Sequence, residues 1–185
     1  SEIAEYATKY PGRFGVMKGD LKSALKSRME GALFDAAFGA LVDEELLTLR
    51  GERVRLAGSP WEPPAELSAA LAAVETKLEA AGFQVPEVAD WQAGLGASGA
   101  EVLALGYFLG RLVRVSQDLT YTVGQMDSLR SKLVAWFESR QALTIGDLRD
   151  LVGVSRKYGV PLLEHCDRMG WTMRVGDERR KGVRL

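Results

Sequence analysis

Basic side chains gather at two places in the last third of the sequence, one at the expected start of a helix and one in the hairpin after it. The two candidate segments, with the residues that accompany the basic ones, are Ser155, Arg156, Lys157 and Tyr158, followed by Arg174, Gly176, Arg179, Arg180 and Lys181. A helix N-terminus presents unpaired N–H groups and the positive end of its dipole, and basic residues strengthen its preference for phosphate. Tyr158 could stack on a base or pack inside the protein. The pattern favours a nucleic-acid backbone site, and the alternative is an ordinary solvated surface.

The distribution of charge supports the same region. The 185 residues are 46% hydrophobic and 26% charged, which is enough for one ordinary domain or for two or three small ones. Residues 1–125 hold 12 Lys and Arg against 17 Asp and Glu, whereas residues 126–185 hold 12 against 8. The net charge of -1 therefore hides a basic C-terminal third, where a polyanion site is expected.

Composition excludes several classes of protein. Cys166 is the only cysteine, which rules out an internal disulfide and a cysteine-based zinc site and fits a reducing compartment. No apolar run approaches the roughly 20 residues of a membrane span, and the acidic start does not resemble a signal peptide. We expect a cytoplasmic protein with no membrane partner.

Catalytic and metal sites are poorly supported. Gly94, Gly96 and Gly99 match G-x-G-x-x-G, but no strand precedes them, and no G-x-x-x-x-G-K-[ST] phosphate loop occurs. The run 164–167 holds ligand-type side chains, yet consecutive helix positions point about 100° apart and cannot converge on one metal. We expect His165 to be partly exposed, Cys166 to fill the core, and the chain to have no catalytic residues, no metal and no enzyme activity of its own.

The chain repeats one arrangement three times: helices, then a hairpin around turns near Gly51, Gln117 and Asp177. Helices followed by a two-stranded wing are typical of the winged helix, a helix-turn-helix relative. We predict a mainly α fold with small β-hairpin wings, in tandem winged-helix modules at 1–57, 65–125 and 126–185. A linker is expected at 58–64.

Local signals predict individual elements. Apolar spacing predicts a helix over 65–81, a capping box is expected at 98–101 and a helix start at 144–147, and 83–97 is expected to be largely a loop. The last helix begins at Ser155, although Pro161 is too deep for an unbroken helix unless that helix begins near Val160. The closing hairpin is expected to pair 171–175 with 183–185.

The C-terminal pattern resembles a known family. The residues that carry the likeness are Arg156-Lys157-Tyr158, Pro161-Leu162-Leu163-Glu164, Asp167-Arg168, Thr172, Arg174-Val175-Gly176-Asp177 and Arg179. They are similar to the end of the bacterial selenocysteine-specific translation elongation factor, which has a GTPase part followed by four winged-helix modules. The likeness is specific over residues 150–179 and architectural before residue 125. The tail from Arg180 to Leu185 is longer and more basic than the family pattern.

The resemblance implies a function. In the family the last module binds a messenger RNA stem-loop near an in-frame UGA codon, which tethers the GTP-bound factor and its selenocysteinyl-tRNA at the ribosome. GTP and Mg²⁺ belong to the part that precedes this region, and the chain itself is expected to be a monomer without cofactors. Arg156, Lys157, Arg174 and Arg179 would contact phosphates, with Tyr158 or a wing backbone group near an unstacked base.

Two other functions stay open at this stage. A winged-helix DNA-binding transcriptional regulator needs a helix face dense in base-reading side chains, but Val160, Leu162 and Leu163 follow Tyr158. A protein-protein scaffold is favoured if the basic clusters prove scattered after folding.

Overall fold

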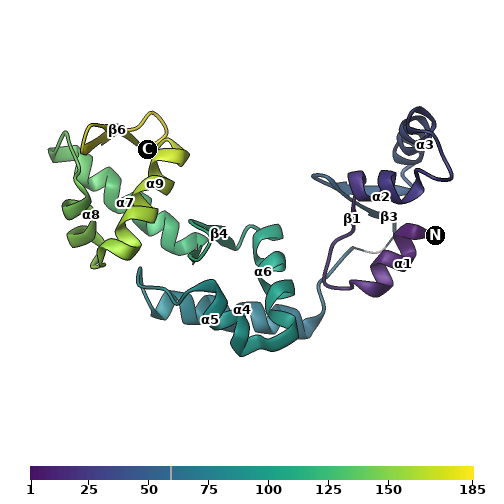
Figure 1. The fold of residues 1–185 in the computed structure, drawn as a ribbon, viewed down its shortest axis with the longest axis horizontal. Coiled ribbons are helices and arrows are strands. Elements are labelled where there is room, and N and C mark those ends of the chain that lie inside the picture. Colours follow the sequence, from purple (N-terminus) through teal and green to yellow (C-terminus); the bar gives the residue numbers. More distant parts are fainter. Residues whose placement is uncertain (59) are drawn as a thin grey trace. The chain divides into compact units, whose positions relative to one another are not determined.

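The computed structural model describes residues 1–58 and 60–185, which form two compact units, Ser1–Ser68 and Ala69–Leu185 (Figure 1). Both units are helical with small antiparallel hairpins, so the predicted fold class is confirmed. The expected linker at 58–64 includes Ser59, which lies outside the described residues. The three module boundaries stay a prediction. No helix in the described ranges is both long and apolar enough to cross a membrane.

The first unit is one winged helix. Its elements are α1 (Glu2–Lys9), β1 (Val16–Met17), α2 (Lys18–Leu25), α3 (Gly31–Asp43), β2 (Leu47–Arg50) and β3 (Arg53–Leu56). The strands pair antiparallel in the order β1-β3-β2. The short strand β1 was not predicted, because two residues carry no readable alternation. Gly51, with φ +57°, allows the tight turn that joins β2 to β3.

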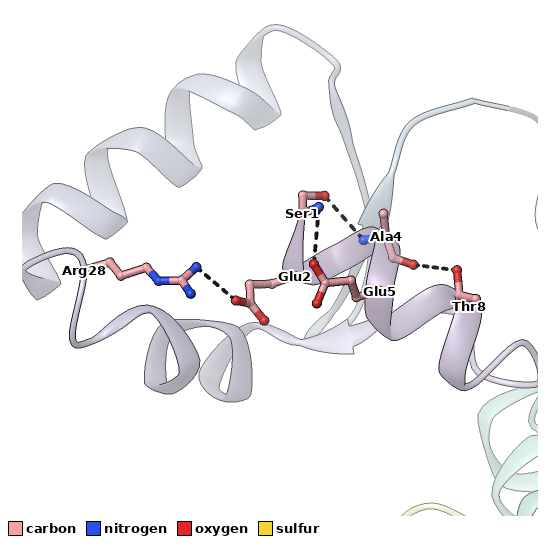
Figure 2. Close-up of polar contacts among 6 residues, drawn as sticks. All are labelled: Ser1, Glu2, Ala4, Glu5, Thr8 and Arg28. Atoms are coloured by element: carbon pink, nitrogen blue, oxygen red, sulfur yellow. Dashed lines mark hydrogen bonds and ion pairs between the residues drawn. The ribbon is translucent and has the colours of Figure 1, made fainter.

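Apolar side chains from all six elements meet in the core of this unit. The buried members are Val16, Leu21, Phe34, Phe38, Leu47 and Val54, with Ile3 and Tyr6 of α1 packed against them. Figure 2 shows how α1 is fixed at its start: Ser1 accepts a hydrogen bond from the Ala4 N–H, and Arg28 forms an ion pair with Glu2 at 3.3 Å. The ion pair ties α1 to the segment after α2.

The first half of the second unit contains most of α4 (Ala65–Ala80), whose first four residues belong to the first unit, followed by α5 (Val88–Leu95), a 3₁₀ turn at Gly96–Ser98, α6 (Gly99–Phe108), β4 (Leu112–Arg114) and β5 (Thr120–Thr122). The expectation of a loop over 83–97 is wrong, because α5 forms there and buries Trp91. The expected capping box at Ser98 is also wrong. The Ser98 hydroxyl donates to the Leu95 carbonyl instead of accepting from the start of α6.

The second half contains α7 (Val123–Ser139), α8 (Ile145–Val152), α9 (Arg156–Met169), β6 (Thr172–Val175) and β7 (Glu178–Lys181). Figure 1 shows these helices and β6 gathered near the C-terminus. The helix start expected at 144–147 is confirmed, and Thr144 and Asp147 form a capping box there. The start of the last helix after Ser155 is confirmed, whereas the expected break at Pro161 is wrong, since α9 is continuous through it.

The closing hairpin pairs different residues from those predicted. A two-residue turn, with Gly176 at φ +62°, places Glu178 opposite Val175. The partner strand is therefore Glu178–Lys181, and residues 183–185 lie beyond the hairpin. The backbone of Arg179 also pairs with that of Leu143 through two hydrogen bonds of 2.8 and 2.9 Å. This pairing ties the wing to the chain just before α8.

Side-chain hydrogen bonds join the two halves of the second unit. The Gln125 amide donates to the carbonyls of Leu78 and Gly82, at the end of α4. The Gln84 amide donates to the Gly153 carbonyl at 3.0 Å. β5 runs directly into α7 through the Thr122 cap, so no loop separates the halves. These contacts hold the two halves of the unit together.

Candidate nucleic-acid interface

A pocket of about 340 Å³ lies between the start of α8, one face of α9 and the wing. The residues that line it are Ile145, Arg156, Val160, Leu163, Glu164, Arg174, Asp177 and Arg179. Arg156, Val160, Leu163 and Glu164 are spaced along one face of a helix, so α9 forms one wall. The pocket therefore has an apolar part and a rim that carries charges of both signs.

Arg156 and Arg174 come to the same pocket from different elements. Arg156 is the first residue of α9, and Arg174 lies on β6, where its Nε donates to the Gly176 carbonyl at 3.1 Å. Both side chains are exposed, and neither forms a salt bridge in the described part of the chain. Two guanidinium groups that face one cavity, close to a helix N-terminus, suit a phosphate group.

Arg179 has a structural position. It is 8% exposed, and its Nε and Nη2 atoms each lie 3.2 Å from Oδ2 of Asp167. The Thr172 hydroxyl donates to the other oxygen of Asp167 at 2.5 Å. The Arg179 guanidinium is thus paired with a carboxylate inside the module, and this pairing does not fit a contact with phosphate.

Arg180 lies on the other face of the wing. It stands opposite Met173 in the hairpin register, whereas Arg174 stands opposite Arg179. Directly paired residues share a face, and successive residues alternate between faces. Arg180 therefore points away from the pocket that Arg174 lines.

Lys157 is turned toward the first half of the unit. Its Nζ lies 2.6 Å from Oε1 of Glu87, at the start of α5. The hydrogen bond that Lys157 donates to this carboxylate raises the pKa of Lys157 above its ordinary value, and the charge of Glu87 acts in the same direction. Because neighbouring helix positions diverge by about 100°, Arg156 and Lys157 serve different surfaces.

The other predicted site residues occupy three positions. Ser155 is the N-cap of α9, exposed and without a capping hydrogen bond from its side chain. Tyr158 is half-buried beside Lys157, whose Nζ is 5.6 Å from the ring centroid, and it is absent from the pocket lining. Gly176 forms the wing turn, where its carbonyl orients Arg174. None of the three lines the pocket, and Gly176 affects it only by orienting Arg174.

The sequence reasoning missed the pocket's acidic members, Glu164 and Asp177. Glu164 follows Arg156 by eight positions, two helical turns, which places both on one face of α9. A carboxylate repels phosphate but accepts hydrogen bonds from the amino and imino groups of a base. Helical spacing alone could have signalled Glu164, whereas Asp177 needed the register of the wing.

His165 lies on the face of α9 that contacts the first half of the unit. The expectation that it is partly exposed is wrong, since only 5% of it is accessible. Burial lowers its pKa, as does the charge of Arg168, whose Nη2 lies 3.5 Å from His165 Nδ1. Arg168 also donates to the Val115 carbonyl at 2.5 Å, which links α9 to the turn after β4.

Cys166 is fully buried, and burial raises the pKa of its thiol to about 12. This thiol is un-ionised at neutral pH and packs as a core residue, as predicted. No group of three or more His, Cys, Asp or Glu side chains is placed to hold a metal ion within residues 1–58 and 60–185.

The fold and the site define a protein of tandem winged-helix modules with a basic pocket in the last one. Two family models described as elongation factor SelB, winged helix, match residues 1–56 and 135–180, together more than half of the chain. The chain belongs to this family of SelB winged-helix regions. A selenocysteine-specific elongation factor from Desulfomicrobium baculatum is 28% identical over 180 residues. That match covers 96% of this chain, which spans 28% of the relative's length.

Two solved structures share the fold. The mRNA-binding domain of elongation factor SelB from E. coli, in complex with SECIS RNA, is 23% identical with a TM-score of 0.50. It covers 62% of this chain and 98% of its own. A bacterial selenocysteine-specific elongation factor, EF-Sec, is 22% identical with a TM-score of 0.54, covering 96% of this chain and 28% of its own. At these identities the likeness concerns the fold.

Proposed function

We propose that the last module binds a stem-loop in messenger RNA through the pocket between α9 and the wing. The observation that carries this proposal is the convergence of Arg156 and Arg174 on one pocket, where neither forms a salt bridge in the part of the chain that the structure describes. Both guanidinium groups contact phosphates on the RNA backbone, and the start of α9 adds its N–H groups. The contact set is smaller than the sequence predicts, because Arg179 is buried and Arg180 lies on the other face.

The pocket itself receives one unstacked base. A-form stems hide their base edges, so proteins read the bases that loops and bulges expose. Val160 and Leu163 supply an apolar wall for the base, while Glu164 and Asp177 accept hydrogen bonds from its edge. These carboxylates favour a base that presents N–H donors. The face offers little for reading a DNA major groove, which argues against the transcriptional regulator.

The chain acts as the RNA-tethering part of a longer selenocysteine-specific elongation factor. Support comes from the two family models and from the relative in Desulfomicrobium baculatum. In that longer protein, GTP, Mg²⁺ and selenocysteinyl-tRNA bind the part outside this chain, and the ribosome is the site of action. This chain contributes binding and no catalytic step.

The test measures binding of a messenger stem-loop to the full chain by fluorescence anisotropy. A duplex DNA of equal length is the competitor. We expect the stem-loop to bind at least tenfold tighter than the DNA. With two or three phosphate contacts, the log-log dependence on salt should have a slope of about -2, from roughly 0.7 to 0.9 per contact. Equal binding of both ligands, or of neither, contradicts the proposal.

A further inference from the structure

A second cationic surface lies at the opposite end of α9. Nη2 of Arg130, on α7, donates to the Arg184 carbonyl at 3.0 Å. The backbone N–H of Arg184 donates to the Gly170 carbonyl, at the end of α9, at 2.9 Å. We call Arg130 and Arg184 the tail patch. Since α9 has 14 residues, about 20 Å of helix separate this patch from Arg156.

Arg130 is held in place with most of its donors unused. Its guanidinium carbon lies 6.0 Å from the ring centroid of Trp171, a distance that allows a cation–π contact. The carbonyl of Arg184 engages one of the five N–H donors that a guanidinium carries. Arg130 and Arg184 are both exposed. The patch is therefore preorganised and accessible.

No salt bridge compensates the charge of the tail patch within residues 1–58 and 60–185. Neither arginine forms a salt bridge in the part of the chain that the structure describes, and the same holds for the exposed neighbours Arg180 and Lys181. The negative end of the α9 dipole offsets part of the repulsion between the two cations. Like charges that lie together without a partner oppose folding. An arrangement that lowers stability in this way is expected where a site serves a function.

The geometry points to the phosphate backbone of a second RNA helix as the ligand of the tail patch, held while the α9 pocket holds the stem-loop. We infer this from two exposed guanidinium groups that form no salt bridge in the described residues, because guanidinium matches phosphate in shape and charge. Arginine is also enriched in protein interfaces, so an acidic protein is the competing ligand that the polyglutamate competition below tests. This inference rests on the proposed function only where it assigns the stem-loop to the pocket between α9 and the wing.

The experiment uses the full chain and a fluorescent blunt RNA duplex of unrelated sequence, with unlabelled stem-loop at saturation. We expect the duplex to bind in the presence of the stem-loop. The double variant Arg130→Ala/Arg184→Ala should bind the duplex about tenfold more weakly, with a salt slope smaller by about 2. Its stem-loop affinity should be unchanged. Arg156→Ala/Arg174→Ala should show the reverse pattern.

Control variants separate charge from structure. Lys132→Ala removes a neighbouring exposed cation of α7 and should leave duplex binding unchanged. Arg130→Lys/Arg184→Lys keeps the charge and should keep most of the salt slope. If the alanine pair fails to fold by circular dichroism, Arg184→Gln alone should weaken duplex binding about threefold.

Several results overturn the inference. Displacement of the duplex by the stem-loop shows a single shared site, and unchanged duplex binding in the double variant removes both arginines from it. Loss of stem-loop affinity in the double variant assigns the patch to the stem-loop site. Displacement of the duplex by polyglutamate at equal charge shows a general polyanion or acidic-protein surface. Failure of the wild type to bind the stem-loop refutes the proposed function and leaves the duplex measurement interpretable.

Discussion

Lys157 Nζ and Glu87 Oε1 lie 2.6 Å apart, across the two halves of the second unit. Arg156, the preceding residue, lines the pocket at the wing. The adjacent cations therefore have different roles: Arg156 is available to a ligand, while Lys157 joins α9 to α5. Charge clustering in a sequence does not reveal this division, because it depends on which face of the helix each residue occupies.

This division predicts unequal effects of two neighbouring substitutions. Arg156→Ala should weaken stem-loop binding about tenfold, whereas Lys157→Ala should weaken it no more than about threefold, because Glu87 already neutralises that lysine. Fluorescence anisotropy at fixed salt measures both. Equal losses of affinity in the two variants contradict the assignment of Lys157 to the ion pair with Glu87.

A companion variant addresses Glu87 directly. Glu87→Gln removes a negative charge next to the pocket's helix and frees Lys157, so stem-loop affinity should rise by roughly two- to fivefold. Because both partners of the pair are partly exposed, the free energy of unfolding should change little. Weaker binding of this variant contradicts the argument.

The pair of Asp167 and Arg179 should matter for stability more than for RNA. Asp167→Asn leaves a buried guanidinium without its carboxylate, which should lower the free energy of unfolding by about 2–4 kcal/mol. Urea denaturation followed by circular dichroism measures this loss. Asp150→Asn, on the exposed face of α8, is the matched control and should change the free energy of unfolding by less than about 0.5 kcal/mol.

His165 predicts how stability responds to mild acid. Its pKa in the folded chain lies below the ordinary value of 6.5, because burial and Arg168 disfavour the charged ring. The unfolded chain therefore binds a proton first, so stability is complete above about pH 6.5 and falls as the pH drops below it. Thermal melts between pH 7.5 and 5 should show a falling melting temperature.

The matched variant is His165→Gln, which keeps a polar side chain of similar size. It should flatten the pH dependence between 7.5 and 5, since His165 is the only histidine in the chain. An identical slope in both proteins shows that another group controls this range.

The capping box at the start of α8 predicts a separate acid response. Hydrogen bonds from the Thr144 side chain and backbone lower the pKa of Asp147 below its ordinary value of 3.8. This contribution is present above about pH 4 and lost as the pH falls through the lowered value. Thr144→Ala should cost about 1 kcal/mol at pH 7, measured by urea denaturation. A variant as stable as the wild type contradicts the role of the cap.

Sequence patterns predicted the elements whose signals are local. The helix start at 144–147 depends on side chains within four residues of one another, and Gly51 and Gly176 mark two of the hairpin turns. The capping box expected at Ser98 does not form, because the Ser98 hydroxyl donates to the carbonyl of Leu95, the last residue of α5. α5 was not predicted, because Pro86, Gly94 and Gly96 are typical of loops and outweigh the short apolar pattern of this helix.

The site was only partly predictable, for a physical reason. Arg156 and Arg174 were identified from residue type and from their places at a helix start and a strand. The burial of Arg179, the pairing of Lys157 and the burial of His165 all depend on partners distant in sequence or on strand register. Such tertiary contacts override local expectation.

The double variant Arg156→Ala/Arg174→Ala tests the central claim most directly. Its stem-loop affinity should fall by about 10- to 100-fold and its salt slope should be smaller by roughly 1 to 2, while its melting temperature stays within a few degrees of the wild type. Unchanged stem-loop affinity in a folded double variant would show that RNA does not bind between α9 and the wing.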